Sequence, residues 1–158
     1  MSQDIFLKLN GIDGESQDAV HTGEIDITSW TWEITQDSTM QSGSGGGAGK
    51  STVADITLTH NMDRSSPNLA KYCFTGKHIS EAILTMRKAG GIPFDFSRIT
   101  MSDVIISHYA PIVSGPLCQE SFRLSFARMK YEYMLQNSLG GSAGVVTALI
   151  DVKANKST

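Results

Sequence analysis

Apolar and polar residues alternate along most of this chain, and this period of two constrains the fold more than any other feature. Successive side chains of a β-strand point to opposite faces, so a strand with one buried face reads as an alternation. The alternating apolar sets are Ile5, Leu7 and Leu9; Ile25 and Ile27; Ala82, Leu84 and Met86; Phe94 and Phe96; Phe122, Leu124 and Phe126; and Val146, Ala148, Ile150 and Val152. The pattern predicts a mainly β fold.

In two of these segments the alternation changes phase. The sets that follow the change are Trp30, Trp32 and Ile34 in the first segment, and Met129, Tyr131 and Tyr133 in the second. An unbroken strand cannot move its buried set to the other face, so we expect bulges near Ser29 and Ala127, or strands that are covered on different faces at their two ends. Both options are typical of a curved sheet. We predict a closed β-barrel of about eight strands whose outside packs against a helix or a neighbouring subunit.

One short helix is predicted in the middle of the chain. Ser66 can cap it, Pro67 fits the first helical position and Gly76 ends it. Its apolar face has helical spacing and consists of Leu69, Tyr72 and Cys73. A helix of this length depends on tertiary packing. We therefore expect it to flank the barrel or plug one end, with Cys73 as a buried structural thiol.

Composition excludes several classes of protein. The 158 residues suffice for one domain, 1–158, and a net charge of -3 with scattered basic residues provides no cationic surface for nucleic acid. The apolar runs are far shorter than the ~18 residues of a membrane helix. The sequence MSQDIFLKL at the amino terminus lacks the features of a secretory signal, and two distant cysteines fit a reducing compartment. We expect any export to use another route.

The run GSGGGAGKS from Gly43 to Ser51 superficially matches a phosphate-binding loop. Such a loop needs a strand before it and a helix after it, so that the helix N-terminus meets the anion. Here Ser44 replaces the first glycine, and Ala54, Ile56 and Leu58 alternate after the loop and predict a strand. We interpret the run as a long, extended glycine-rich loop between strands.

Other candidate chemistry is equally incomplete. Ser142 lies in GGSAG, but no histidine follows it, and the next residues predict a strand where a nucleophile elbow needs a helix. The histidines lack the spacing of metal ligands; they are His21, His60, His78 and His108. Glu24 and Asp26 share a strand face on which carboxylates are usually just solvated. We predict no catalytic, cofactor-binding or metal site.

Four blocks of sequence, in this order and spacing, resemble a known family. They are DIFLKLNGIDGES at 4–16, EIDITSWTWEI at 24–34, the glycine-rich loop ending at Lys50, and SSPNLAKYCFTGKHISEAILTMRKAGG at 65–91. From residue 4 to about residue 135 the chain resembles Hcp, the haemolysin-coregulated protein of bacterial type VI secretion. The resemblance implies a compact β-barrel with one flanking helix and implies neither a reaction nor a cofactor.

The resemblance also implies partners and a location. Relatives form homohexameric rings that stack into a hollow tube inside a contractile sheath on a baseplate, with a spike protein at the tip. Effector proteins travel in the lumen, where the ring acts as their receptor and chaperone. The resemblance implies a bacterial cytoplasmic protein that is secreted on firing without a cleavable signal peptide. We expect no fused C-terminal toxin domain, no nucleic acid partner and no membrane insertion.

Two site hypotheses follow from this resemblance. Thr31 lies between Trp30 and Trp32, so alternation points it away from both indoles, and we expect it to face the lumen and contact effectors. The loop residues expected to reach a neighbouring subunit or the next ring are Gly43, Ser44, Gly45, Gly46, Gly47, Ala48, Gly49, Lys50 and Ser51. A disordered surface linker is the alternative for this loop.

Two other classes remain open at this point. The first is a monomeric lectin-like or lipocalin-like barrel that uses Trp30 and Trp32 as a binding platform, although two tryptophans on one strand face more often fill a core. The second is an enzyme, either a hydrolase built on Ser142 or an NTPase built on Lys50. Oligomeric state separates the tube protein from the binder, and activity assays separate it from the enzyme.

Overall fold

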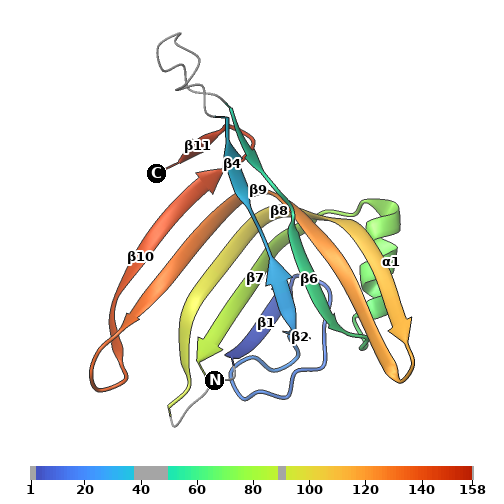
Figure 1. The fold of residues 1–158 in the computed structure, drawn as a ribbon, viewed down its shortest axis with the longest axis horizontal. Helices are drawn as coiled ribbons and strands as arrows, with labels where there is room; N and C mark the ends of the chain where they lie inside the picture. The colour runs from blue at the N-terminus through green and yellow to red at the C-terminus, as the bar shows by residue number, and fades with distance from the viewer. Residues whose placement is uncertain (1–2, 38–49, 89–91, 158) are drawn as a thin grey trace.

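The computed structural model describes residues 3–37, 50–88 and 92–157 and is mainly β, as the alternation predicts (Figure 1). The elements of this part of the chain are, in order, β1 Gln3–Leu9, β2 Ile25–Ile27, β3 Ser29–Thr31, β4 Ile34–Gln36, β5 Ser51–Val53, β6 Ile56–Asn61, α1 Ser66–Thr75, β7 Ile79–Lys88, β8 Phe94–Ser114, β9 Leu117–Gln136, β10 Ser142–Asp151 and β11 Lys156–Ser157.

The main sheet nearly closes on itself, which confirms the predicted barrel-like β fold. The strands β9, β8, β7, β1 and β2 are neighbours in that order, while β6 pairs with β9 on one side and with β3 on the other. Only Thr28 separates β2, which pairs with β1, from β3, which pairs with β6. The bend at Thr28 therefore joins the two ends of the curved sheet. The strands outnumber the predicted eight because interruptions divide residues 25–36 into β2, β3 and β4 and residues 51–61 into β5 and β6.

The two predicted phase changes have different structural causes. The first is the bend at Thr28, where the chain stops pairing with β1 and starts pairing with β6. The Thr28 backbone N–H donates to Thr59 O at 2.9 Å. At the second, β9 is continuous, and the irregularity lies in the facing strand β8. There Asp103, opposite Ala127, has a φ of 54°, and the register shifts between Ile106 and His108. β9 changes its other neighbour from β6 to β10 at the same place.

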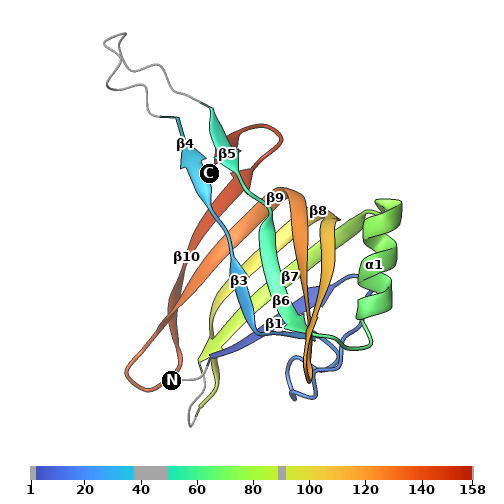
Figure 2. The same cartoon turned by 45° about the vertical axis from the view of Figure 1, so that its right-hand side comes forward.

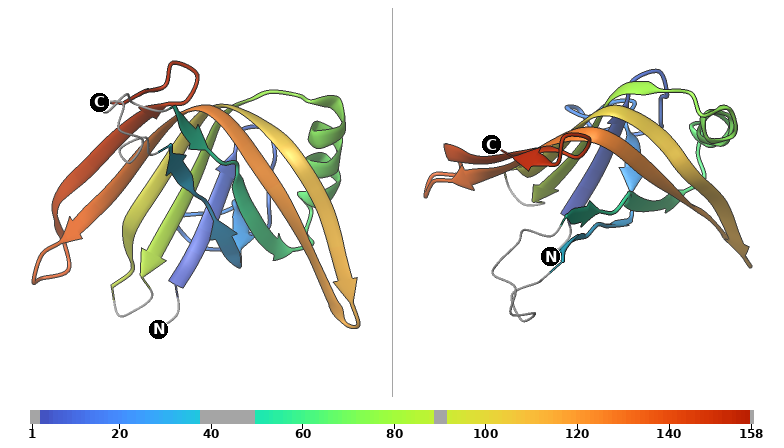
Figure 3. Two further views of the ribbon diagram at one scale, coloured as in Figure 1. Left: turned by 45° about the horizontal axis from the view of Figure 1, so that its top comes forward. Right: turned by 90° about the horizontal axis from the view of Figure 1, so that it is seen from above.

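Two parts of the sheet extend beyond the barrel on opposite sides (Figures 1 and 3). We call β10, together with residues 128–136 of β9, the wing, because these strands pair with each other and continue away from the closed part. We call residues 111–118 the hairpin end, where β8 turns into β9 near α1. A separate two-stranded ribbon of β4 and β5 projects from a third position (Figure 2).

The interior of the barrel is filled by side chains. The largest fully buried ones are Phe122, Leu7, Ile25, Ile56, Leu58, Leu69, Ile79, Leu84, Ile99, Met101, Ile106 and Leu124. Burial of one such side chain stabilises a fold by about 1.5–3 kcal/mol. These residues come from α1 and from six strands, so a single core holds the helix and these strands in place.

Helix α1 flanks β8, as predicted, with Leu69 buried and Cys73 half-buried. Gly76 ends it in the left-handed conformation, with a φ of 66°. The predicted cap is wrong by one residue, because Ser65 holds the N-cap position and the Ser66 side chain turns instead to Glu120. No described helix has the length and apolar character required to cross a membrane.

Candidate functional site

One outer face of the barrel carries small polar side chains. Residues paired across β3, β6 and β9 share a face, and this face consists of Ser29, Thr31, Thr57, Thr59, Ser121 and Arg123. Thr31 is exposed, while Trp30 is half-buried against the core on the other face. The face that Thr31 shares is therefore hydroxyl-rich, and beside it Thr31 lines a hollow of about 190 Å³ together with Trp32.

Trp30 and Trp32 contribute to the core. Trp32 donates its indole N–H to Ala54 O at 2.9 Å, and its ring meets Phe126 and Tyr131 at centroid distances of 6.4 and 6.3 Å. Trp30 packs against the same buried cluster. An indole that is held in this way has little free face for stacking on a ligand. The arrangement fits the interpretation of the two tryptophans as structural residues.

The glycine-rich loop is bracketed by two paired strands. Ile34 pairs with Val53 and Gln36 with Ser51, so the chain leaves and re-enters the ribbon at one end. Lys50 is exposed, and Ser51 donates its hydroxyl to Asn155 Oδ1 at 2.8 Å. The remaining loop positions lie outside the described residues; they are Gly43, Ser44, Gly45, Gly46, Gly47, Ala48 and Gly49. Strand β5 begins at Ser51, directly after Lys50, whereas a phosphate-binding loop requires a helix at this position.

The wing exposes apolar side chains. Val146 pairs with Tyr133 and Ala148 with Tyr131, so these four residues share the face that continues into the barrel interior at Met129. Tyr133 is 44% exposed and Val146 is 61% exposed. Every residue of β10 from Ser142 to Leu149 is exposed, and only the last two residues of the strand are half-buried. Its sequence nevertheless alternates like that of a strand with one buried face. An apolar face of this kind marks an interaction surface.

The hairpin end forms a second and different apolar patch. Ile112, Val113 and Leu117 are 53%, 64% and 59% exposed, respectively. Leu117 pairs with Ser114 and therefore shares a face of the hairpin with Ile112, whereas Val113 pairs with Cys118 and lies on the other face. The hairpin end and the wing extend on opposite sides of the barrel (Figure 3). The molecule therefore presents two unlike apolar surfaces.

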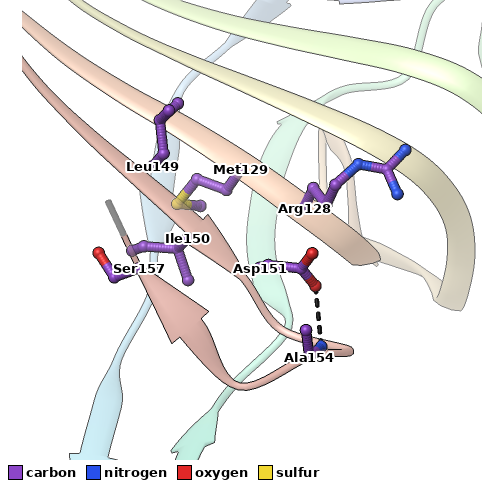
Figure 4. Close-up of a pocket in the computed structure, with 7 residues that line it drawn as sticks. All are labelled: Arg128, Met129, Leu149, Ile150, Asp151, Ala154 and Ser157. Atoms are coloured by element: carbon purple, nitrogen blue, oxygen red, sulfur yellow. Dashed lines mark hydrogen bonds between the residues drawn. The ribbon is translucent and has the colours of Figure 1, made fainter.

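A surface hollow of about 310 Å³ lies at the root of the wing (Figure 4). Its lining residues are Arg128, Met129, Leu149, Ile150, Asp151, Ala154 and Ser157. Asp151 Oδ1 accepts a hydrogen bond from the Ala154 backbone N–H at 2.9 Å, and Arg128 bonds to Asp103 instead. The hollow includes neither Trp30 nor Trp32, which separates it from the predicted ligand platform.

The carboxylates that the sequence places together do not form an acid–base pair. Glu24 Oε2 lies 2.9 Å from His21 Nδ1, and His21 Nε2 lies 3.2 Å from Asp95 Oδ2. The expectation that Glu24 is merely solvated is thus wrong, because its carboxylate is hydrogen-bonded to His21. Asp26 is exposed, yet partial desolvation and, to a smaller extent, the charge on Asp63 raise its pKa.

The remaining candidate nucleophile and metal ligands are dispersed. Ser142 Oγ accepts a weak hydrogen bond from Gly144 N at 3.4 Å in the turn that opens β10, in agreement with a hairpin turn at this position. Within residues 3–37, 50–88 and 92–157, no three His, Cys, Asp or Glu side chains are grouped to hold a metal ion. Cys73 and Cys118 are free thiols.

The most extensive buried polar cluster was missed by the sequence reasoning. Glu120 and His60 are both fully buried, with His60 Nε2 2.7 Å from Glu120 Oε1. Their positions carried a signal, because Glu120 is in phase with Phe122 and Leu124, and His60 with Leu58. A charged residue in phase with a buried set predicts an internal polar contact.

The comparisons with known proteins are consistent with this geometry. A family model described as "Type VI secretion system effector, Hcp" matches residues 6–133. Protein hcp1 of Pseudomonas aeruginosa is 39% identical over 147 residues, which span 91% of each chain.

Solved structures extend the similarity to the full fold. Hcp1 of Salmonella typhimurium is 45% identical with a TM-score of 0.83 and complete coverage of both chains. Hcp2 of the same organism is 42% identical with a TM-score of 0.76, covering 97% of this chain and 98% of its own. A structure titled as a type six secretion system protein has a TM-score of 0.91 at 25% identity, covering 99% and 100%. The similarity thus includes the wing and the hairpin end.

Proposed function

This chain belongs to the Hcp family of type VI secretion proteins, and we propose that it is a structural subunit of the secretion tube, in which six copies close into a ring and rings stack. The observation that carries this proposal is the presence of two unlike apolar patches, on the wing and on the hairpin end, which extend on opposite sides of one barrel. The family acts by assembly and secretion, and the role that we assign to this chain requires no reaction.

Ring closure explains why the two patches differ. A cyclic ring is held by head-to-tail contacts, which join two different surfaces of adjacent subunits, whereas a two-fold dimer uses one surface twice. The wing supplies one apolar surface through Tyr133 and Val146, and the hairpin end supplies the other through Ile112 and Leu117. Stable specific contacts bury about 800 Å² on each partner. Surfaces built on paired strands can provide this area without rearrangement of the barrel.

The hydroxyl-rich face is the surface that we assign to the lumen. Thr31 and Thr57 present small polar groups there, with Arg123 on the same face. Such a wall leaves space for an effector protein and offers hydrogen bonds without an adhesive apolar patch. In this proposal Thr31 contacts the cargo directly.

The glycine-rich loop is assigned to contacts between subunits or rings. The ribbon of β4 and β5 projects from the barrel and carries both ends of residues 37–50 away from it (Figure 2). Lys50 and Ser51 stand at the base of the loop, with Ser51 bonded to Asn155. If the loop contacts a neighbour, backbone hydrogen exchange of residues 43–51 slows on assembly, and equal exchange in the single subunit and the tube contradicts the assignment.

The same proposal includes the wider apparatus. Residues 1–158 act as one barrel domain, the stacked rings connect to a spike protein, and a contractile sheath on a baseplate drives them out of the bacterial cytoplasm. Effector proteins travel inside the tube. These partners follow from the family, and the exposed surfaces described above leave room for them.

Electron microscopy of the purified protein tests the proposal. Negatively stained particles should show rings with six-fold symmetry and a central hole. Small, solitary particles would instead favour the monomeric binding barrel, although its interior is filled and the indoles of Trp30 and Trp32 pack against the core.

A further inference from the structure

A single buried carboxylate joins four separate elements next to the hairpin end. Glu120 of β9 has no exposed side-chain surface and accepts hydrogen bonds from Ser66 Oγ of α1 at 2.7 Å and from the Tyr109 hydroxyl of β8. His60 of β6 lies 2.7 Å away through Nε2. We call these four residues the joint.

The joint stands where the hairpin leaves the barrel. Glu120 pairs with His60 on one side and with Pro111 of β8 on the other. Residues 111–118, immediately beyond it, are exposed. Helix α1 begins at Ser66, so the same carboxylate fixes the start of the helix. The orientation of the hairpin end relative to the barrel therefore depends on contacts to Glu120.

The hydrogen bonds of the joint require a charged carboxylate and a neutral imidazole. A carboxylate is an acceptor only, and it accommodates the three donors that surround Glu120. His60 Nδ1 is buried without a partner, so protonation there would create a buried N–H with nothing to accept it. Protonation of Glu120 would turn one acceptor oxygen into a competing donor. Either event leaves buried polar atoms unsatisfied, which strongly destabilises such a contact.

No other charged group compensates for this loss. Among the described residues, Glu120 bonds to His60, Ser66 and Tyr109, and no lysine or arginine pairs with it. Asp63 precedes α1, accepts a hydrogen bond from Ser65 through its carboxylate and donates its backbone N–H to Ser66 Oγ at 3.0 Å. On β8, His108 Nδ1 is also buried and unpartnered. Burial and the hydrogen bond to Glu120 raise the pKa of Tyr109 to about 12, so its hydroxyl remains a donor at neutral and acidic pH.

We propose that the joint of Glu120, His60, Ser66 and Tyr109 is an acid-sensitive latch, whose proton uptake frees the hairpin end from the barrel and takes assembled rings apart. The second half of this inference rests on the proposed function, which assigns the hairpin end to the contact between subunits. The first half concerns the single subunit and stands without it.

Hydrogen exchange on the full chain, followed by mass spectrometry, tests the latch. The pH is varied from about 8 to about 5, the range in which histidine ordinarily titrates, and rates are corrected for the intrinsic pH dependence of exchange. We expect amides of residues 107–120 to lose protection by roughly tenfold or more towards acid, while amides of β1 and β7 keep theirs. The particle mass, measured by light scattering on the same samples, should fall over the same interval.

Variants separate the latch from general acid sensitivity. Glu120→Gln keeps the side-chain shape but removes the charge, so its hairpin should exchange rapidly at neutral pH and with a flat pH profile. Should this variant fail to fold, Tyr109→Phe and Ser66→Ala retain the carboxylate and lose one donor each. These two should release the hairpin at a higher pH than the unmodified protein. His78→Asn alters an exposed histidine outside the joint and should leave the profile unchanged.

Three results would overturn the proposal. Protection of 107–120 that is constant with pH excludes the latch, and so does a loss that β1 and β7 share. A pH profile that is the same in Tyr109→Phe, Ser66→Ala and the unmodified protein assigns any release to other groups. Solitary subunits at every pH would contradict the ring instead, and hairpin exchange in those subunits would still decide the latch.

Discussion

Arg87 Nη2 lies 2.6 Å from Asp18 Oδ1, and this ion pair fastens the long connection between β1 and β2 to the outside of β7. Arg87 Nη1 donates to Asp18 Oδ2 at 2.8 Å, which makes the contact bidentate. The guanidinium also bonds to Asp4 and lies 4.9 Å above the Phe6 ring. The hydrogen bonds from Arg87 hold the pKa of Asp18 well below its usual range.

We predict that Asp18→Asn makes the protein less stable at neutral pH and that the deficit shrinks in acid. A carboxylate with a lowered folded-state pKa stabilises the fold above its ordinary pKa, and this contribution disappears as the pH falls towards the folded-state value. Urea denaturation from neutral pH to about pH 2 measures both effects. Asp37→Asn, at an exposed position, is the control. A deficit that stays constant across this range would contradict the account.

Gly14→Ala should lower the free energy of unfolding by about 1–3 kcal/mol, because a Cβ at this position cannot be accommodated without backbone movement. It would lie 2.6 Å from Glu24 O and 2.7 Å from Ile25 Cα, where the connection between β1 and β2 crosses the start of β2. Gly141→Ala is the matched control, since its Cβ would meet the flexible Asn137 side chain at 3.3 Å. Equal urea midpoints for the two variants would show that this crossing is not tightly packed.

Thr31→Tyr should reduce effector loading while rings remain intact. The larger side chain would extend from the hydroxyl-rich face, which lies opposite the core, so folding should be unaffected. Co-purification of an effector with the assembled protein measures loading, and Thr31→Ser serves as the control that keeps the hydroxyl. Loss of the ring in Thr31→Tyr would reassign Thr31 to a contact between subunits.

Val146→Lys should prevent assembly without unfolding the subunit. The change puts a charge in the centre of the apolar face of the wing, beside Tyr133, at a position that is already exposed in the single subunit. The subunit should keep its stability to within about 0.5 kcal/mol, as surface substitutions usually do. Thr147→Lys points to the other side of the same strand, opposite Glu132, and should assemble. If Val146→Lys forms rings as the unmodified protein does, the apolar face of the wing is not the contact.

Much of the barrel could be predicted from the sequence because alternation reports directly which face is buried. Ile56 and Leu58 of β6 and Leu84 of β7 are fully buried, as their spacing indicates. β10 shows the limit of this signal. Val146 and Ala148 alternate in the same way but are exposed in the single chain. Alternation indicates that a face is apolar and cannot tell whether the same chain or another one covers it.

Contacts between distant segments could not be predicted in the same way. Ser66 satisfies every local requirement of a helix cap, yet its hydroxyl donates to Glu120, and Ser65 takes the cap position. Glu120 itself is in phase with buried residues, but a carboxylate at such a position can be buried only if donors arrive from elsewhere. Those donors come from residues 11, 54 and 60 positions away in the sequence.

Sedimentation equilibrium of the purified chain, over a wide range of concentrations, tests the central claim that this protein works through self-association. The account predicts a species of six times the 17.1 kDa chain mass, or whole multiples of it where rings stack. A mass of 17.1 kDa at every concentration, with Val146→Lys and the unmodified protein indistinguishable, would contradict it.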